Sequence, residues 1–437
     1  MSPDPVQPRP LGRDLPTRQP SLDTIGRPDR VLAEPVDSLS LRDALALALL
    51  QSPQLATFSW EVRAQEARVL QASRRSNPLI EAWVEDVGAT ARGDAAGNLQ
   101  SIQPQSTVQL SQVIELGGKR VQRRDLAARS RDLAAWDYEA ARMDVLTGTT
   151  HAFIDVLTAQ AQVALSERTS RLAEEVRQSV SARVAAGDAS PVEETREELA
   201  LAAARVESTR SARALTASRQ RLAASWGATA AGFAAAAGTL GIADTLPAMA
   251  ELSARVSDNP DLARWAAELQ MREAALRSER WKRVPDLTLR AGYRAFQGLG
   301  IETFILGGSF PIPLFDRNRG AIDEAKSRFA KSREGRRAAE ALVAVRLAEA
   351  YGMLTGSHAE VRALRETVLP GSQRTFDAIA EGYRLGRFSY LEFLDAQRTL
   401  IGASTQYLQA LAEYNKAAAN VERLTGATLQ AVPPNAQ

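Results

Sequence analysis

The sequence of 437 residues contains no cysteine. This absence excludes disulfide bonds, thiolate metal ligands and thiol catalysis. Only two histidines, His151 and His358, and five methionines are present, so a cage of soft metal ligands within the chain is not expected. Each histidine lacks a nearby acid or second histidine at ligand spacing, and we interpret both as ordinary helix residues. No supported Ser-His-Asp set and no nucleotide-binding glycine pattern occurs, so we predict neither enzymatic activity nor a cofactor.

Charge of one sign and long hydrophobic runs are also missing. The 54 basic and 52 acidic residues leave a net charge of +2, which argues against a nucleic-acid partner. No run of about 18 apolar residues is present, so no transmembrane helix is predicted. Residues 1–37 are rich in proline and arginine, and we expect them, like the tail 427–437, to be disordered. No secretory signal is recognisable in this segment, and no N-terminal cysteine is available for a lipid anchor.

The chain carries an internal duplication. Helix starts at SPQL (52–55) and NPDL (259–262) are followed by the proline-marked boundaries SNPLI (76–80) and RVPDL (283–287) at the same spacing. Ser40 with Asp43 marks a further helix start. The segments SQVIELGGKR (111–120) and SFPIPLFDRNRG (309–320) correspond in the same way. We therefore predict two structural repeats, residues 38–240 and 241–426. The glycine pair of ELGGKR fits a strand-to-helix turn with positive φ better than a phosphate site.

Very long helices are expected between these segments. No proline lies between Pro104 and Pro191, and apolar residues recur with helical spacing. A helix over most of this stretch would span roughly 100 Å, and its heptad-like pattern favours helices packed side by side as a coiled coil. In the second repeat, Pro370-Gly371 predicts a kink or a short non-helical joint. On the helices alone, a soluble coiled-coil scaffold is an equally good interpretation.

Two pairs of strands are predicted from alternating apolar and polar residues. Apolar residues alternate with polar ones over 286–295 and again over 303–312, more clearly than over 79–87, and Val108 and Leu110 alternate with polar neighbours. Ten alternating residues match the length of a tilted strand that crosses a bilayer. A soluble hairpin packed on the helices is the alternative. Because four strands cannot close a barrel and open edges are not viable in lipid, membrane insertion would require several copies to share one barrel.

The stretch YRLGRFSYLEFLDAQ (383–397) has a counterpart in VAAGDASPVEETREE (184–198). Gly187 and Gly386 permit a sharp turn, and Ser190 and Ser389 are placed to cap the returning helices. Two acids, Glu392 and Asp395, then lie one helical turn apart on the same face of the second returning helix. The first copy has Arg196 where Asp395 would fall, so the two tips differ in charge.

These features together resemble the outer-membrane efflux protein (TolC-like) family over about residues 38–426, most specifically in SNPLIEAWVED, QVIELGGKR, AAGDASPVEE and YRLGRFSYLEFLDAQ. The resemblance implies a mainly α protein with transmembrane β-structure. In it, a homotrimer forms a twelve-stranded β-barrel, four strands per chain, in the outer-membrane lipid of a bacterial cell. A long α-helical coiled-coil tunnel continues it into the periplasm. The implied function is the passive exit duct of a tripartite efflux pump, with a periplasmic adaptor and an inner-membrane transporter of the resistance-nodulation-division type as partners.

IELGGKR (114–120) is similar to the heavy-metal branch of the family, of the cobalt-zinc-cadmium and copper-silver type, which implies divalent cations as cargo. A pump for organic toxicants is the alternative. The resemblance also places Glu392 and Asp395 at an acidic constriction near the periplasmic entrance and Tyr383 at an aromatic position of the same gate. Phe388 stands where the family more often has a basic residue, which Arg384 or Arg387 would have to replace. The tip residues Gly187, Ser190, Gly386 and Ser389 would meet the adaptor.

Overall fold

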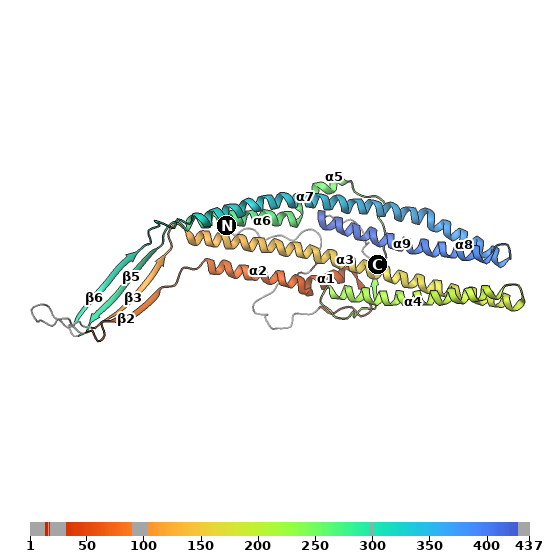
Figure 1. Ribbon diagram of the computed structural model, residues 1–437, viewed down its shortest axis with the longest axis horizontal. Helices are drawn as coiled ribbons and strands as arrows, with labels where there is room; N and C mark the ends of the chain where they lie inside the picture. Colours follow the sequence, from red (N-terminus) through yellow and green to blue (C-terminus); the bar gives the residue numbers. More distant parts are fainter. Residues whose placement is uncertain (1–13, 16, 18–31, 90–103, 298–299, 427–437) are drawn as a thin grey trace, which may run out of the picture. The chain divides into compact units, whose positions relative to one another are not determined.

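The computed structural model describes residues 14–15, 17, 32–89, 104–297 and 300–426, and the chain forms two units (Figure 1). The sheet unit consists of residues 62–134 and 265–336, and the helical unit of the remaining segments. None of the helices within the described ranges combines the length and the hydrophobicity that a membrane-crossing helix requires.

Most of the chain is helical. Four helices contribute residues to both units: α2 (Pro53–Ala72), α3 (Lys119–Ala186), α6 (Pro260–Trp281) and α7 (Arg319–Ala363). With 68 residues, α3 confirms the predicted long helix. The helical unit also contains α1 (Leu41–Gln51), α4 (Pro191–Ala224), α5 (Met249–Arg255), the 3₁₀ turn Val256–Asp258, α8 (Leu369–Arg384), α9 (Tyr390–Thr425), and the short parallel strands β1 (Ser38–Ser40) and β4 (Ala235–Ala237).

The sheet unit contains the four predicted strands in one antiparallel sheet of order β2-β3-β5-β6. The strands are β2 (Leu79–Glu85), β3 (Gln105–Ile114), β5 (Leu287–Phe296) and β6 (Ile301–Ser309). The pairing connects the two halves of the sequence, because β3 lies beside β5 with Val108 opposite Tyr293. Among the described residues, no strand pairs with the outer edge of β2 or of β6. Most of the segment between β2 and β3 lies outside the described residues.

One face of this sheet is rich in exposed apolar side chains. Residues opposite each other in an antiparallel pair share a face, and the register places apolar residues of all four strands on this one, which we call the apolar face: Ile80, Ala82, Val108, Leu110, Ala291, Tyr293, Phe304 and Leu306. Phe304 and Leu306 are 91% and 89% exposed, whereas Thr107 on the opposite, polar face is 1% exposed. On the polar face the Arg294 guanidinium donates to the Thr107 hydroxyl over 3.1 Å. The sheet therefore exposes its apolar side chains and covers polar ones.

Local sequence signals account for the element ends. The Ser40 hydroxyl accepts from the amide of Asp43 at the start of α1, as predicted. Asn259 precedes α6, and its side chain accepts from the amide of Asp261. The glycines of ELGGKR adopt φ values of 68° and 72° at the turn from β3 into α3, which confirms the interpretation of this motif as a turn.

Of the two outcomes expected at Pro370-Gly371, a kink or a short non-helical joint, the joint is wrong. A π-helical turn, Leu364–Val368, connects α7 to α8, and the backbone stays helical through the proline. A proline removes one helical hydrogen bond and its ring crowds the carbonyl four residues earlier, here that of Glu366. The wider π turn includes that carbonyl, and a π turn is one way in which a helix accommodates such a disturbance.

The predicted disordered termini lie largely outside the described residues. Where residues 1–37 are described, they are attached to the helical unit. The Glu34 carboxylate accepts from the amides of Gly232 and Phe233, and Leu15 packs in the cluster that contains Leu49. The ordered part of the chain therefore begins before residue 38, because backbone amides far along the sequence provide partners that composition does not reveal.

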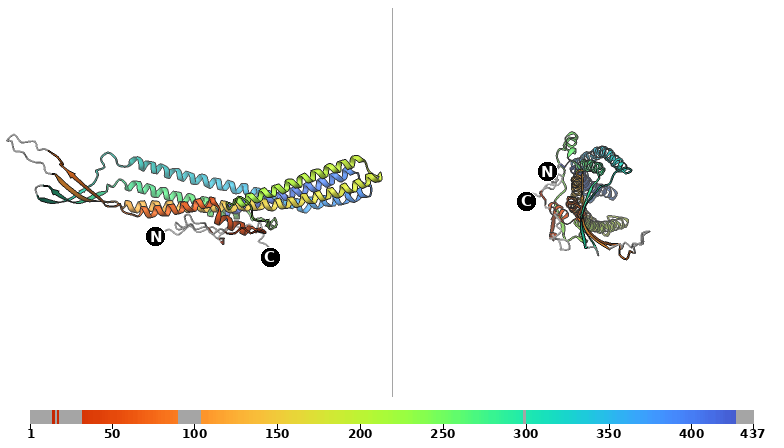
Figure 2. Two further views of the ribbon diagram at one scale, coloured as in Figure 1. Left: turned by 90° about the horizontal axis from the view of Figure 1, so that it is seen from below. Right: turned by 90° about the vertical axis from the view of Figure 1, so that its left-hand side faces the viewer.

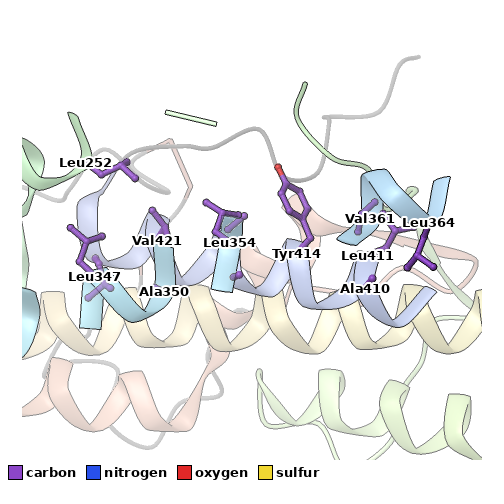
Figure 3. Close-up of a cluster of buried hydrophobic side chains, with 13 residues drawn as sticks. Leu252, Leu347, Ala350, Leu354, Val361, Leu364, Ala410, Leu411, Tyr414 and Val421 are labelled. Carbon is purple, nitrogen blue, oxygen red and sulfur yellow. The ribbon is translucent and has the colours of Figure 1, made fainter. Parts of the chain in front are cut away.

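The largest buried cluster of the helical unit packs α7 against α9 (Figure 3). Leu347, Leu354 and Val361 of α7 are fully buried and recur every seven residues, the spacing of a coiled-coil seam. They pack with Leu411, Val421 and other residues of α9. Complete burial of one such side chain contributes about 1.5–3 kcal/mol to stability.

This packing predicts different costs for two neighbouring substitutions. Leu354→Ala removes a side chain that is 0% exposed and should lower the free energy of unfolding by about 2–5 kcal/mol. Met353→Ala, at a residue that is 58% exposed, should change it by less than about 0.5 kcal/mol. Denaturant unfolding in detergent, followed by the helical circular-dichroism signal, measures both. Equal effects would show that the α7–α9 cluster does not carry the stability of the helical unit.

Candidate functional site: the paired helix tips

The two helix tips of the helical unit, at the α3–α4 and α8–α9 connections, have the same backbone design (Figure 2). Gly187 follows α3 with φ of 82°; its amide donates to the Val184 carbonyl, and the Asp188 amide donates to the Arg183 carbonyl. This pair of bonds is a Schellman motif, which satisfies carbonyls that the helix end leaves unpaired. The Ser190 hydroxyl then accepts from the Val192 amide and caps α4.

The second tip repeats this design with a stronger cap. Gly386 has φ of 70°, and its amide and that of Arg387 donate to the carbonyls of Tyr383 and Gly382. The Ser389 hydroxyl accepts from the Glu392 amide, and the Glu392 carboxylate accepts from the Ser389 amide over 2.7 Å. This reciprocal capping box and the bond from the Ser389 hydroxyl lower the pKa of Glu392. The predicted turn and cap roles of the two glycines and two serines are confirmed.

Side-chain sizes are exchanged between the tips. In the second tip the Phe388 ring packs so closely on Gly382 that a Cβ there would lie 2.2 Å from the ring. The corresponding positions of the first tip are Arg183 and Ala189, so the large side chain stands on the helix and the small one in the turn. The Arg183 guanidinium lies over the Tyr383 ring at 4.9 Å. The duplication therefore became asymmetric where the two hairpins meet.

An aromatic cluster joins the hairpins. Tyr383 and Phe393 stack with ring centroids 5.3 Å apart, and Tyr390 packs beside Tyr383 at 6.2 Å. All three are buried, and the partly buried Val176 of α3 packs against them. Tyr383, predicted as the aromatic residue of a gate, is thus a buried contact between the α8–α9 hairpin and the α3–α4 hairpin. Stacked aromatic pairs contribute about 0.5–1.5 kcal/mol beyond their buried area.

Two acids of α4 face the tyrosines. The Tyr383 hydroxyl donates to the Glu193 carboxylate over 3.4 Å. Burial, opposed by the nearby Arg183 and reinforced by Glu193, raises the pKa of Tyr383. Glu197, one turn further along α4, is 1% exposed and lies against Tyr390. Burial raises the pKa of the Glu197 carboxyl, with the Tyr390 hydroxyl opposing this shift, and burial together with Glu197 raises the pKa of Tyr390.

The predicted acidic pair lies on the other side of α9. Glu392 and Asp395 are both exposed, while Phe393 and Ala396 beside them are buried. Asp395 is free of the capping box that holds Glu392. Arg384, considered as a partner for the gate, pairs with Glu381 on its own helix. The structure therefore keeps the two carboxylates on an exposed helix face and separates them from Tyr383, whose charged neighbours are Arg183 and Glu193.

No group of three or more potential ligand side chains is placed to hold a metal ion in the described part of the chain. His151 contacts the Lys416 carbonyl at 3.2 Å, and burial lowers its pKa. His358 contacts the Ala243 carbonyl at 2.9 Å and packs on Tyr414. Both act as packing residues of helices, in agreement with their interpretation from sequence.

Sequence reasoning missed Glu197, Arg183 and Tyr390 as members of the tip cluster. One sequence signal was present: Glu193 and Glu197 are spaced i, i+4, which places both carboxylates on one face of the helix. Their importance depends on which face of α4 is covered, and only the packing of the second hairpin determines that.

With the strands and tips described, the class of the protein follows from comparison. The sequence pattern of the family described as "Outer membrane efflux protein" matches residues 44–228 and 252–427. The chain belongs to this family: it is an outer-membrane efflux channel of the TolC type, with a periplasmic helical extension, and not an enzyme. The soluble scaffold considered above is thereby excluded.

Individual relatives are consistent with this class. The chain is 34% identical over 393 residues to the cobalt-zinc-cadmium resistance protein CzcC of Cupriavidus metallidurans, covering 90% of this chain and 91% of that protein. The structure is similar to a membrane protein from Pseudomonas aeruginosa with a TM-score of 0.77, 18% identity, and coverage of 94% and 97%. It is also similar to the outer-membrane channel OprN with a TM-score of 0.75, 17% identity, and coverage of 98% of both chains. At these identities the two structures show a shared fold.

The raised pKa of Glu197 predicts a pH-dependent contact between the hairpins. Because the packed state holds this proton more tightly than the separated state, the contact should be most stable below the ordinary glutamate pKa and weaken as the pH rises through the raised value. The groups facing Glu197 or its tyrosine partner are Tyr383, Tyr390, Glu193, Arg183 and Arg196. Glu197→Gln keeps the shape and removes the titration, so it should abolish the pH dependence.

Hydrogen-exchange protection factors of α8 and α9 near the tip, measured between pH 4 and 8, test this prediction. Glu198→Gln, at the exposed neighbouring position, is the matched control and should keep the wild-type slope. A slope that persists in Glu197→Gln would assign the pH dependence to another group.

Proposed function

We propose that three copies of this chain form the outer-membrane exit duct of a tripartite efflux pump that passively conducts divalent metal cations from the periplasm to the exterior. The sheet is the observation that carries this proposal. Its apolar face is exposed over all four strands, and Phe304 and Leu306 are almost fully accessible. A sheet with this polarity suits lipid on one face and water on the other.

The open edges of the sheet support sharing of the barrel. The backbone groups along the outer sides of β2 and β6 have no strand partner among the described residues. In a membrane each unpaired group would cost several kcal/mol. A ring in which β6 of one copy pairs with β2 of the next removes every edge, and three copies provide the twelve strands of the proposed barrel.

A stripe on α4 supports side-by-side packing of copies along the helices. Val192, Leu199 and Val206 are exposed and recur every seven residues. Heptad spacing of apolar residues is the pattern by which one helix packs along another. In the proposed trimer this stripe faces a helix of the neighbouring copy and continues the barrel as a tunnel.

Divalent cations are proposed as cargo because the relative CzcC is described as a cobalt-zinc-cadmium resistance protein and is 34% identical over nearly the whole chain. Three copies would place Glu392 and Asp395 in rings of like charge, which attract cations. Both carboxylates are exposed, as such rings require. Tyr383 would then hold the α8–α9 hairpin against the α3–α4 hairpin through Glu193 and Arg183, and its release would let the tip move.

A periplasmic adaptor and an inner-membrane transporter of the resistance-nodulation-division type complete the proposed pump. The two tips are suited to contact the adaptor because their turns are exposed and have matching backbones. A Cβ added at Gly187 or at Gly386 would meet no atom within 4 Å, so both turns leave open space for a partner.

Neutralising the acidic pair should reduce cation selectivity. Glu392→Gln keeps the capping box, since glutamine serves at this position, so the start of α9 is preserved. Combined with Asp395→Asn, it should move the cation-to-anion permeability ratio of the channel in planar bilayers toward one, because both charge rings disappear. A matched control removes two other exposed acids, Glu207→Gln with Glu251→Gln. Unchanged selectivity of the tip variant would contradict the gate assignment, and failure of the wild-type protein to conduct would contradict the duct.

Straining the turns should prevent docking while the trimer persists. Gly187→Val with Gly386→Val forces valine into positive φ at both turns, which costs about 1–2 kcal/mol or more at each. Adaptor capture by the purified protein should be lost, and native mass should still report a trimer. The control makes the same substitution at two helical glycines with open surroundings, Gly356→Val and Gly402→Val. Undiminished capture by the tip variant would mean that the adaptor binds elsewhere.

A further inference from the structure

The sheet unit contains a basic pocket at the end of α6. Its volume is about 840 Å³, and four arginines line it with Trp281: Arg277, Arg280, Arg283 and Arg317. They come from two separate segments: the end of α6 together with the α6–β5 connection, and the β6–α7 connection. Nothing in the proposed duct or gate uses this pocket.

Only one of the four arginines is neutralised. Arg277 pairs with Asp125 at 2.8 Å and with Glu273 at 3.0 Å. Within the described ranges, Arg280, Arg283 and Arg317 have no ion-pair partner. Like charges that converge without a counter-charge repel each other, so a pocket of this kind is suited to an anion. Arginine is also the residue that binds phosphate through two parallel hydrogen bonds.

The wall of the pocket is held in place by contacts with neighbouring segments. Trp281 packs against the strand-to-helix turn of ELGGKR, where a Cβ at Gly117 would lie 3.1 Å from its ring. That turn is tied to the start of β5, because Asp286 accepts from the Leu116 amide at 3.1 Å and pairs with Lys119 at 2.8 Å. The ring is nonetheless 42% exposed. Trp281 is therefore held in place with part of its surface open.

Apolar surface continues from the pocket. The β6–α7 connection, which provides Arg317, exposes Phe310, Ile312, Leu314 and Phe315, the last of them completely. β5 follows Arg283 in the chain and carries Ala291 and Tyr293 of the apolar face. Exposed apolar groups beside tryptophan and arginine are the arrangement found where a protein passes from the lipid core to the headgroups.

We infer that this pocket binds the phosphate of an anionic phospholipid, with Arg280, Arg283 and Arg317 as ligands and the acyl chains along the apolar connection. The inference rests on the proposed insertion of the sheet into the membrane. A soluble phosphate would use the same arginines but not the apolar surface, and this surface favours the lipid. The bound headgroup would anchor the sheet unit at the level of one membrane surface.

Native mass spectrometry of the full-length protein released from nanodiscs tests the inference. In mixed phosphatidylglycerol and phosphatidylcholine nanodiscs, the wild-type protein should retain phosphatidylglycerol in preference. Arg280→Gln with Arg283→Gln and Arg317→Gln should reduce its retention at least about tenfold, since three charged hydrogen-bonding groups are lost. The control makes the same charge change at three exposed arginines of the helical unit: Arg210, Arg213 and Arg255.

Competition with inorganic phosphate distinguishes the two sources of the anion. Retention that survives millimolar phosphate supports the lipid, and displacement by phosphate overturns it. Equal retention by the pocket variant and the wild type also overturns the inference. Conductance of the same variants in planar bilayers separates the two proposals. A conducting channel without lipid retention contradicts the pocket alone, and absence of conductance in the wild type contradicts the duct.

Discussion

The hydrogen bonds missing along the outer edges of β2 and β6 are the constraint on which the proposed assembly depends. Water can satisfy the amides and carbonyls of an open edge, but lipid cannot. The exposed apolar face of the sheet suits lipid. A single copy in lipid would nevertheless bear this cost, because both of its edges are open. In the proposed assembly, closure by further copies removes this cost, and the apolar stripe of α4 packs on a helix of another copy.

Duplication explains both the backbone design that the two tips share and the side chains in which they differ. Gly187 and Gly386 occupy equivalent positions in two turns of the same kind, and the two serines cap the helices that follow. The side chains that meet between the hairpins have diverged, however, with Arg183 in one copy where Gly382 stands in the other. Divergence is expected there, because two hairpins that pack against each other need complementary rather than identical surfaces. Of the candidate gate, Tyr383 lies in this asymmetric region, whereas Glu392 and Asp395 lie on the exposed face of α9.

The two halves of the sequence also show which structural features a local sequence pattern can predict. ELGGKR predicts a turn with positive φ, and it forms one. The same pattern does not reveal that Gly117 makes room for Trp281, a residue more than 160 positions later, or that this contact shapes an arginine pocket. Proline rules predict a kink or a non-helical joint at Pro370, and the chain stays helical there, with a π turn just before it. A helix that packs along its length gains more by adjusting its hydrogen bonds than by breaking.

The sequence by itself determined the long helices, the four strands and their parities, the caps and the two tips. Each of these depends on residues within a few positions of one another. The tertiary structure alone decided which face of α4 is covered, and so made Glu197 a buried acid beside Tyr390. It also decided that Tyr383 lies between hairpins while Glu392 and Asp395 stay exposed. Burial is a property of what packs against a residue, and for these side chains the packing partners lie nearly two hundred residues away.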